Sequence, residues 1–155
     1  MQATNEKRVK IHFNAKGRDC PVDPDLREHA IEAMNYDYVY FAEFEGMVLA
    51  ETALRGHDEV LRTAFEAAKE LILEGTIVPG DLGWRTDGFG PWPLTPEESV
   101  ARIEREVAEH LRTGERIHMG DICWFDLPAR ITEREAAKRA AAPDSPAPDS
   151  PVKDG

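Results

Sequence analysis

The sequence lacks the features of membrane proteins and of disulfide-stabilised secreted domains. No apolar run approaches the ~18 residues of a membrane-spanning helix, and no apolar segment follows the polar residues 1–8. Its two cysteines, Cys20 and Cys123, are far apart and form no Cys-x-x-Cys motif. Two free thiols are typical of a reducing compartment, so we expect a cytoplasmic protein without a membrane association. Cys123 lies in an apolar run, which favours a core residue over a nucleophile.

Catalytic motifs are also scarce. The chain has no Gly-x-Ser-x-Gly sequence and no glycine-rich phosphate loop, and Ser99 is the one serine within residues 1–142. The histidines show neither the i, i+4 spacing nor the His-x-His pair common in zinc sites; they are His12, His29, His57, His110 and His118. We therefore expect no cofactor, and a non-enzymatic function is favoured over an enzyme.

Charge of one sign dominates the chain. The formal net charge is −11, and residues 1–128 account for it, because the +2 of residues 129–142 cancels the −2 of residues 143–155. An acidic domain repels phosphate backbones, so we do not expect a nucleic-acid partner. The charge is compatible with a basic protein partner, and equally with a role in solubility alone.

Composition divides the chain into three parts. Residues 143–155 consist almost entirely of Pro, Asp, Ala and Ser with one large apolar side chain, Val152, so we expect a disordered tail. Residues 129–142 read as a polar, Ala-rich helix that is loosely attached. Residues 1–128 are long enough for a single globular domain with its own core.

Apolar periodicity predicts four helices in the globular part. They cover residues 23 to about 45, 47–56, 58–74 and 95–114. Asp23-Pro24 and Thr95-Pro96 are typical helix starts, while Gly75 and Gly114 are typical ends. The aromatic stretch 36–45 fits helical spacing and also a period of two. We favour a helix there, because no breaker precedes Gly46.

Strands are expected near residues 8–13, 76–82 and 121–127, where apolar side chains alternate or run together. The predicted fold class is therefore α+β, with three or four helices packed on a small antiparallel sheet. The junction Leu71-Ile72-Leu73-Glu74-Gly75-Thr76-Ile77-Val78 resembles that of winged-helix domains, where a helix ending in Leu-x-x-Gly precedes the wing. This resemblance implies a regulatory domain, winged-helix-like with a helical insertion between the last two strands.

The chain departs from the winged-helix pattern in two respects. About 38 residues separate the last two predicted strands, whereas a wing is a tight hairpin. The helix that would read DNA carries only Arg62 and Lys69 against four glutamates between Glu59 and Glu74. The resemblance therefore implies a regulatory domain more than a DNA-binding one.

Large aromatic residues gather in a segment rich in Gly and Pro. Trp84, Phe89 and Trp92 either close the core from outside or stay exposed as anchors for a protein partner. Pro91 and Pro93 stiffen this segment, which lowers the entropy lost on binding. Our hypothesis for a partner site consists of these three rings.

Acidic residues form two further candidate groups. Gly-Asp turns could bring Asp81, Asp87 and Asp121 together as a site for a hard cation or a shared proton. The alternative is that each bonds backbone amides of its own turn. Glu43 and Glu45 lie in an apolar stretch and are either buried acids or part of a solvated helix face.

The interpretation that best fits these observations is a small acidic cytoplasmic protein that binds another protein, such as an inhibitor or immunity-type protein of a basic partner. The alternatives are a winged-helix-like regulatory domain and a metal-dependent enzyme that uses the carboxylate group. The sequence does not identify the partner or the oligomeric state.

Overall fold

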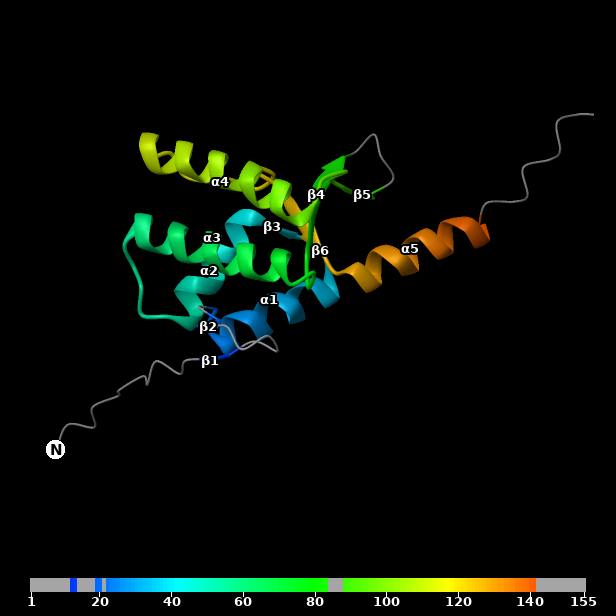
Figure 1. The fold of residues 1–155 in the computed structure, drawn as a ribbon, viewed down its shortest axis with the longest axis horizontal. Helices are drawn as coiled ribbons and strands as arrows, with labels where there is room; N and C mark the ends of the chain where they lie inside the picture. The colour runs from blue at the N-terminus through cyan, green and yellow to red at the C-terminus, as the bar shows by residue number, and fades with distance from the viewer. Residues whose placement is uncertain (1–11, 14–18, 21, 84–87, 142–155) are drawn as a thin grey trace, which may run out of the picture.

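The computed structural model describes residues 12–13, 19–20, 22–83 and 88–141, with only the backbone for the first four of these (Figure 1). Its helices are α1 (Pro24–Tyr36), α2 (Phe41–Glu51), α3 (His57–Leu73), α4 (Pro96–Thr113) and α5 (Pro128–Ala141). Its strands are β1 (His12–Phe13), β2 (Asp19–Cys20), β3 (Val39–Tyr40), β4 (Val78–Gly83), β5 (Gly88–Pro91) and β6 (Trp124–Asp126).

The main sheet is antiparallel, with the strand order β3-β6-β4-β5. Val39 lies opposite Phe125, and Val78 lies opposite Asp126. Helices on a small antiparallel sheet confirm the predicted α+β class. The strand expected at residues 8–13 differs, since residues 8–11 lie outside the described part and β1 pairs only with β2, in a separate two-stranded sheet.

A hairpin that the sequence analysis did not predict joins β4 to β5. The segment rich in Gly, Pro and large aromatic residues contains β5, whose Phe89 lies opposite Leu82 and whose Pro91 lies opposite Gly80. Gly80 makes this pairing possible, because a Cβ there would lie 2.3 Å from the Gly90 carbonyl oxygen. The two backbones approach so closely only because the residue has no side chain.

The helix predicted to continue through residues 36–45 is interrupted at residues 37–40. α1 ends at Tyr36, β3 follows, and α2 begins at Phe41. The two residues of β3 pair with β6, and the Phe41 amide donates to the Cys123 carbonyl oxygen at 3.1 Å. A long-range pairing therefore overrides the local helical pattern. The helix expected at 47–56 is the second half of α2, which ends at Glu51.

The two longest helices were predicted closely. The expected α3 stripe of Val60, Leu61, Ala64, Phe65, Ala68, Leu71 and Ile72 is buried. At the start of α4 the Thr95 hydroxyl accepts from the Glu98 amide at 3.1 Å, and Gly114 ends the helix with a φ of 74°. Strong local signals at both ends explain why these bounds could be read from the sequence.

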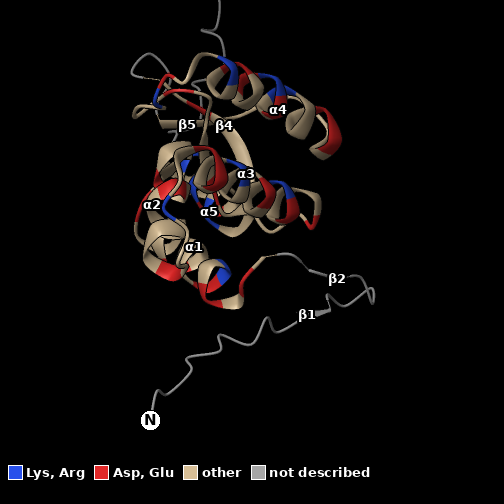
Figure 2. Cartoon of the chain, turned by 90° about the vertical axis from the view of Figure 1, so that its left-hand side faces the viewer, with Lys and Arg blue, Asp and Glu red and all other residues tan. Residues whose placement is uncertain are grey.

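The core lies where α1, α2, α3 and α4 meet one another and the sheet. At its centre Phe125 of β6 lies 5.2 Å from the ring of Phe44 and 6.3 Å from that of Phe41, both on α2. Asp and Glu positions, coloured red on the ribbon, recur along these helices (Figure 2). Within the described residues, no helix is long and apolar enough to cross a membrane.

Helix α5 differs from the others, because none of its residues is buried and Figure 1 shows it pointing away from the rest of the molecule. Its first two turns contact the body through Asp126, which is fully buried and forms ion pairs with Arg130 and Arg134. Arg130 also donates to the Met34 carbonyl oxygen, and Arg134 lies over the ring of Tyr38 at 4.8 Å. The remainder of α5 extends beyond these contacts.

Candidate functional site

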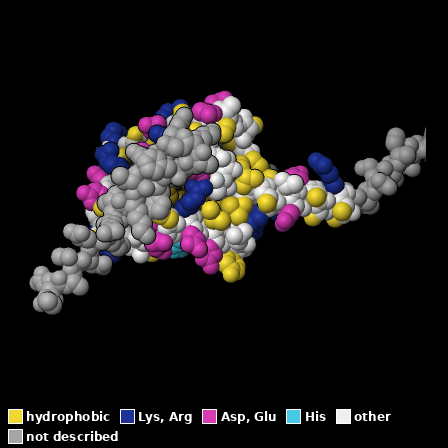
Figure 3. Space-filling view, turned by 60° about the horizontal axis from the view of Figure 1, so that its bottom comes forward, with side chains coloured by type: hydrophobic (Ala, Val, Ile, Leu, Met, Phe, Trp, Pro, Cys, Tyr) yellow, Lys and Arg dark blue, Asp and Glu magenta, His cyan; other side chains and the backbone are white. Residues whose placement is uncertain are grey.

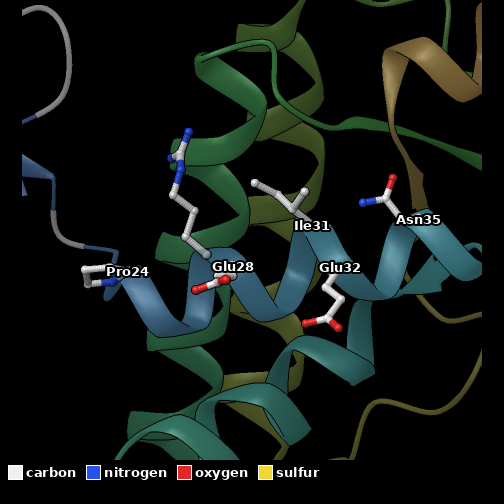
Figure 4. Close-up of a pocket in the computed structure, with 6 residues that line it drawn as sticks. Pro24, Glu28, Ile31, Glu32 and Asn35 are labelled. Atoms are coloured by element: carbon white, nitrogen blue, oxygen red, sulfur yellow. The ribbon is translucent and has the colours of Figure 1, made fainter.

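An open groove of about 520 Å³ runs along the outer face of α1 (Figure 4). Its lining residues recur every three or four positions, as one helix face requires, and are Pro24, Arg27, Glu28, Ile31, Glu32 and Asn35. The opposite face of α1 carries the core residues Leu26, Ala30 and Met34. This arrangement follows from an amphipathic helix whose apolar stripe is narrow and whose outer face keeps one isoleucine.

The helix that carries the groove is anchored firmly. The Asp23 side chain accepts from the Asp25 amide at 2.8 Å, and Pro24 occupies the first turn, as expected from the sequence. Arg27 forms an ion pair of 2.6 Å with Glu74 at the end of α3. The groove therefore lies on a positioned element and not on a loop.

The groove is acidic with an apolar element. The guanidinium of Arg27 is already paired with Glu74, so the exposed carboxylates of Glu28 and Glu32 determine the local charge. Ile31 points to one side of these two carboxylates and is only partly buried (Figure 4). Tyr36, at the end of the same helix, is 82% exposed, the largest exposure among the large hydrophobic residues of the described part. Figure 3 shows magenta acidic and yellow apolar side chains close together on the lower surface.

The aromatic residues proposed as partner anchors lie elsewhere. Phe89 and Trp92 are each only 7% exposed, and Trp84 lies outside the described residues. Phe89 stacks on Tyr38 with a centroid distance of 5.8 Å, and the Arg102 guanidinium lies 3.8 Å above the Trp92 ring. Both rings therefore close the core, and neither offers an exposed surface to a partner.

The proposed carboxylate group is not assembled in the described part of the chain. Asp81 is exposed on β4, and the Asp121 side chain accepts from the His118 amide of its own turn at 2.8 Å, while Asp87 lies outside the described residues. Across the described ranges no three His, Cys, Asp or Glu residues are placed to hold a metal ion. Asp121 thus follows the alternative of a turn-stabilising role.

A polar cluster between β5 and α4 was not foreseen. The Trp92 Nε1 and Glu106 Oε2 atoms are buried without a hydrogen-bond partner, and burial raises the pKa of Glu106. Burial also raises the pKa of the Cys123 thiol well above its usual value, with further contributions from Glu106 and Asp81. A neutral, buried thiol is a poor nucleophile. This cluster therefore combines two unpaired buried polar atoms with a buried thiol.

The two acids of the apolar stretch are partly buried. Desolvation raises the pKa of Glu43, opposed by a hydrogen bond from the Tyr40 amide. Desolvation likewise raises the pKa of Glu45, opposed by the charges of His57, His110 and Arg116. Neither acid lines the α1 groove. Their partial burial therefore affects the free energy of unfolding and not the groove.

The sequence analysis missed the α1 groove. The signal was nevertheless present, because Ile31 lies outside the buried stripe of α1 and Tyr36 follows its last buried residue. Comparison of the chain with protein-family models, with curated proteins and with solved structures found no match. The functional argument therefore depends on the chain's own geometry.

Proposed function

We propose that this chain is a protein-binding protein that holds a basic partner against the outer face of α1. The observation that carries the proposal is the groove itself: the exposed Glu28 and Glu32 share a helix face with the partly buried Ile31, and the exposed Tyr36, which does not line the groove, follows on the same helix. Tyrosine is enriched in protein interfaces, where it supplies a large apolar contact and a hydroxyl for hydrogen bonding.

The shape of the groove favours a macromolecular partner over a small molecule. Sites for small ligands are concave and cover most of the ligand surface, whereas this groove is open and its lining residues all belong to one helix. A helix face with acidic flanks and an apolar centre suits a partner surface that brings lysines or arginines around an apolar residue.

The charge of the chain supports a basic partner. A net charge of −11 on a small domain accelerates encounters with a positively charged protein and slows those with nucleic acid. An inhibitor or immunity-type protein in the cytoplasm, which neutralises a basic partner by covering its surface, would have these properties. The anchor in this proposal is Tyr36 with Ile31, in place of Phe89 and Trp92.

Charge reversal on α1 tests the proposal. The immobilised chain is exposed to lysate of its host, and the Glu28→Lys/Glu32→Lys variant is compared with a matched control, Glu59→Lys/Glu104→Lys, which makes the same charge change on exposed sites of α3 and α4. We expect wild type and control to retain one basic protein near 1:1, and the α1 variant to bind it at least about tenfold more weakly, or ~1.4 kcal/mol.

Two results would overturn the proposal. Equal retention by the α1 variant would show that the groove is not the contact surface. Equal loss from the α1 variant and the control would show that only the total charge matters. Circular dichroism of each variant would establish that the fold is intact.

A winged-helix-like regulatory domain is a second candidate, favoured by the element order. The order of elements in such domains is helix, strand, two helices and a hairpin. This chain has the same order in α1, β3, α2, α3 and β4–β5, with α4 inserted before β6. The sequence departed from the winged-helix pattern because about 38 residues separated its last two predicted strands. The β4–β5 hairpin directly after α3 removes this departure. The exposed residues of α3 remain acidic, with Asp58, Glu59 and Glu66 against Arg62. Failure to retain any DNA duplex at low salt would exclude the DNA-binding form of this candidate.

A further inference from the structure

Helix α5 presents a face that no described part of its own chain covers. Past Arg134 every residue of the helix is exposed, and Figure 1 shows this half directed away from the body. Four alanines at i, i+1, i+4 and i+5 make one flat face: Ala136, Ala137, Ala140 and Ala141. A short helix with no packed side is marginally stable in water, so this half gains stability from any surface that packs against it.

The charge of α5 is opposite to that of the body. Its four basic residues outnumber its two acidic ones, whereas the chain as a whole carries −11. Arg130 and Arg134 are engaged with the buried Asp126, so the charge of the projecting half comes from Lys138 and Arg139 against Glu135, a net +1. The surface that best complements this half is acidic and shallow enough to receive a helix with small side chains.

The α1 groove has these two properties. It is open, and its exposed charges are those of Glu28 and Glu32. The base of α5 also lies beside the end of α1, because Arg130 donates to the Met34 carbonyl oxygen. Since α5 points away from its own body, its projecting half does not contact the α1 groove of its own chain (Figure 1).

We propose that two copies of this chain associate by laying the projecting half of α5 from each copy along the α1 groove of the other. A reciprocal exchange of this kind is closed by a two-fold axis and stops at the dimer. The inference rests on the proposed function, since both use the same groove. Self-association would then cover the groove until a basic partner competes for it, so α5 regulates partner binding.

A charge swap tests the dimer with purified protein alone. One variant carries Glu28→Lys/Glu32→Lys in the groove, and a second carries Lys138→Glu/Arg139→Glu on α5. Sedimentation velocity over a concentration series should show a wild-type dimer that dissociates on dilution and on addition of salt. Each variant alone should remain a monomer, because its groove and its own α5 then carry the same sign of charge.

The decisive step is the 1:1 mixture of the two variants. In the mixture each basic surface meets an acidic one, so the heterodimer should recover an association constant within about threefold of wild type. The Glu59→Lys/Glu104→Lys control should dimerise like wild type, and circular dichroism should show unchanged helix content. A wild-type chain that stays monomeric at several hundred micromolar, a dimer that persists in either variant, or a mixture that stays monomeric would each overturn the inference.

The two proposals can fail separately. The α5 variant keeps its groove intact, so it should capture the basic partner more tightly than wild type does. Capture without any dimer would overturn only the self-association. A charge-dependent dimer whose groove captures no basic partner would overturn only the proposed function.

Discussion

Two aromatic regions of this protein have opposite surroundings. The β4–β5 hairpin and the residue after it carry Phe89 and Trp92, both 7% exposed, whereas α1 ends in Tyr36, which is 82% exposed. Residues 84–93 are rich in Gly, Pro and large rings, as exposed binding loops often are, while α1 resembles an ordinary amphipathic helix. The surface that we propose for a partner nevertheless lies on α1.

The difference follows from strand pairing. Once β5 pairs with β4, alternate side chains of the hairpin must point to opposite faces of the sheet. Phe89 then reaches Tyr38, and the backbone after Pro91 turns inward, with the Trp92 amide donating to the Pro79 carbonyl oxygen at 3.1 Å. No such pairing constrains the end of α1. Aromatic composition alone therefore does not distinguish a core cover from a binding surface.

The largest expected effect is that of Trp92→Ala. Removing this buried ring should lower the free energy of unfolding by about 3–5 kcal/mol, because a large cavity replaces core contacts. Urea unfolding followed by circular dichroism measures it. A variant that keeps wild-type stability but no longer binds a partner would restore the hypothesis that Trp92 is an exposed anchor.

Gly80→Ala should have the second largest effect. It should lower the free energy of unfolding by about 3 kcal/mol, because the new Cβ would collide with the backbone of Gly90. Gly46→Ala is the matched control, since no atom lies within 4 Å of a Cβ at this position of α2. The control should gain about 0.5–1 kcal/mol from helix propensity. Equal effects of the two substitutions in urea unfolding would contradict the close pairing of β4 and β5.

Glu106→Gln should have a smaller and pH-dependent effect. Burial raises the pKa of Glu106, so the folded state binds this proton more tightly than the unfolded state does. That stabilisation is complete below the usual glutamate pKa and is lost as the pH rises through the raised value. The stability of the variant relative to wild type should therefore increase from about pH 4 to about pH 7.

Urea unfolding at both pH values measures this difference. A relative stability that does not change with pH, or that decreases toward neutral pH, would contradict the buried environment assigned to the Glu106 carboxyl group.

Tyr36→Ala should have the smallest effect on stability, within about 0.5 kcal/mol, because its side chain is mostly solvent-exposed. The same variant should weaken binding of the basic partner, which the lysate experiment measures directly. Strong destabilisation would mean that Tyr36 belongs to the core, and the contrast with Trp92 would disappear.

The elements predicted well are those whose signals are local. Helix α4 shows this, since Thr95, Pro96 and Gly114 define its bounds within a few residues of each end. The elements predicted wrongly depend on pairing that the local pattern does not decide. β3 exists because Val39 meets Phe125 from the other end of the domain, and β5 exists because Gly80 admits a close strand. The pattern of residues 36–45 fitted both a helix and a strand, and only the pairing with β6 selects the strand at Val39–Tyr40.

The candidate site likewise has some features that depend on the sequence alone and others that depend on the tertiary structure. The acidity of the chain is a property of the sequence, and it already favoured a basic protein partner over nucleic acid. The sequence by itself determined the α+β class, the bounds of α3 and α4 and the sign of the charge, because these depend on local spacing and composition. The tertiary structure alone decided which aromatic rings are covered and that α5 projects from a buried ion-pair cluster, because both depend on contacts between residues far apart in the chain.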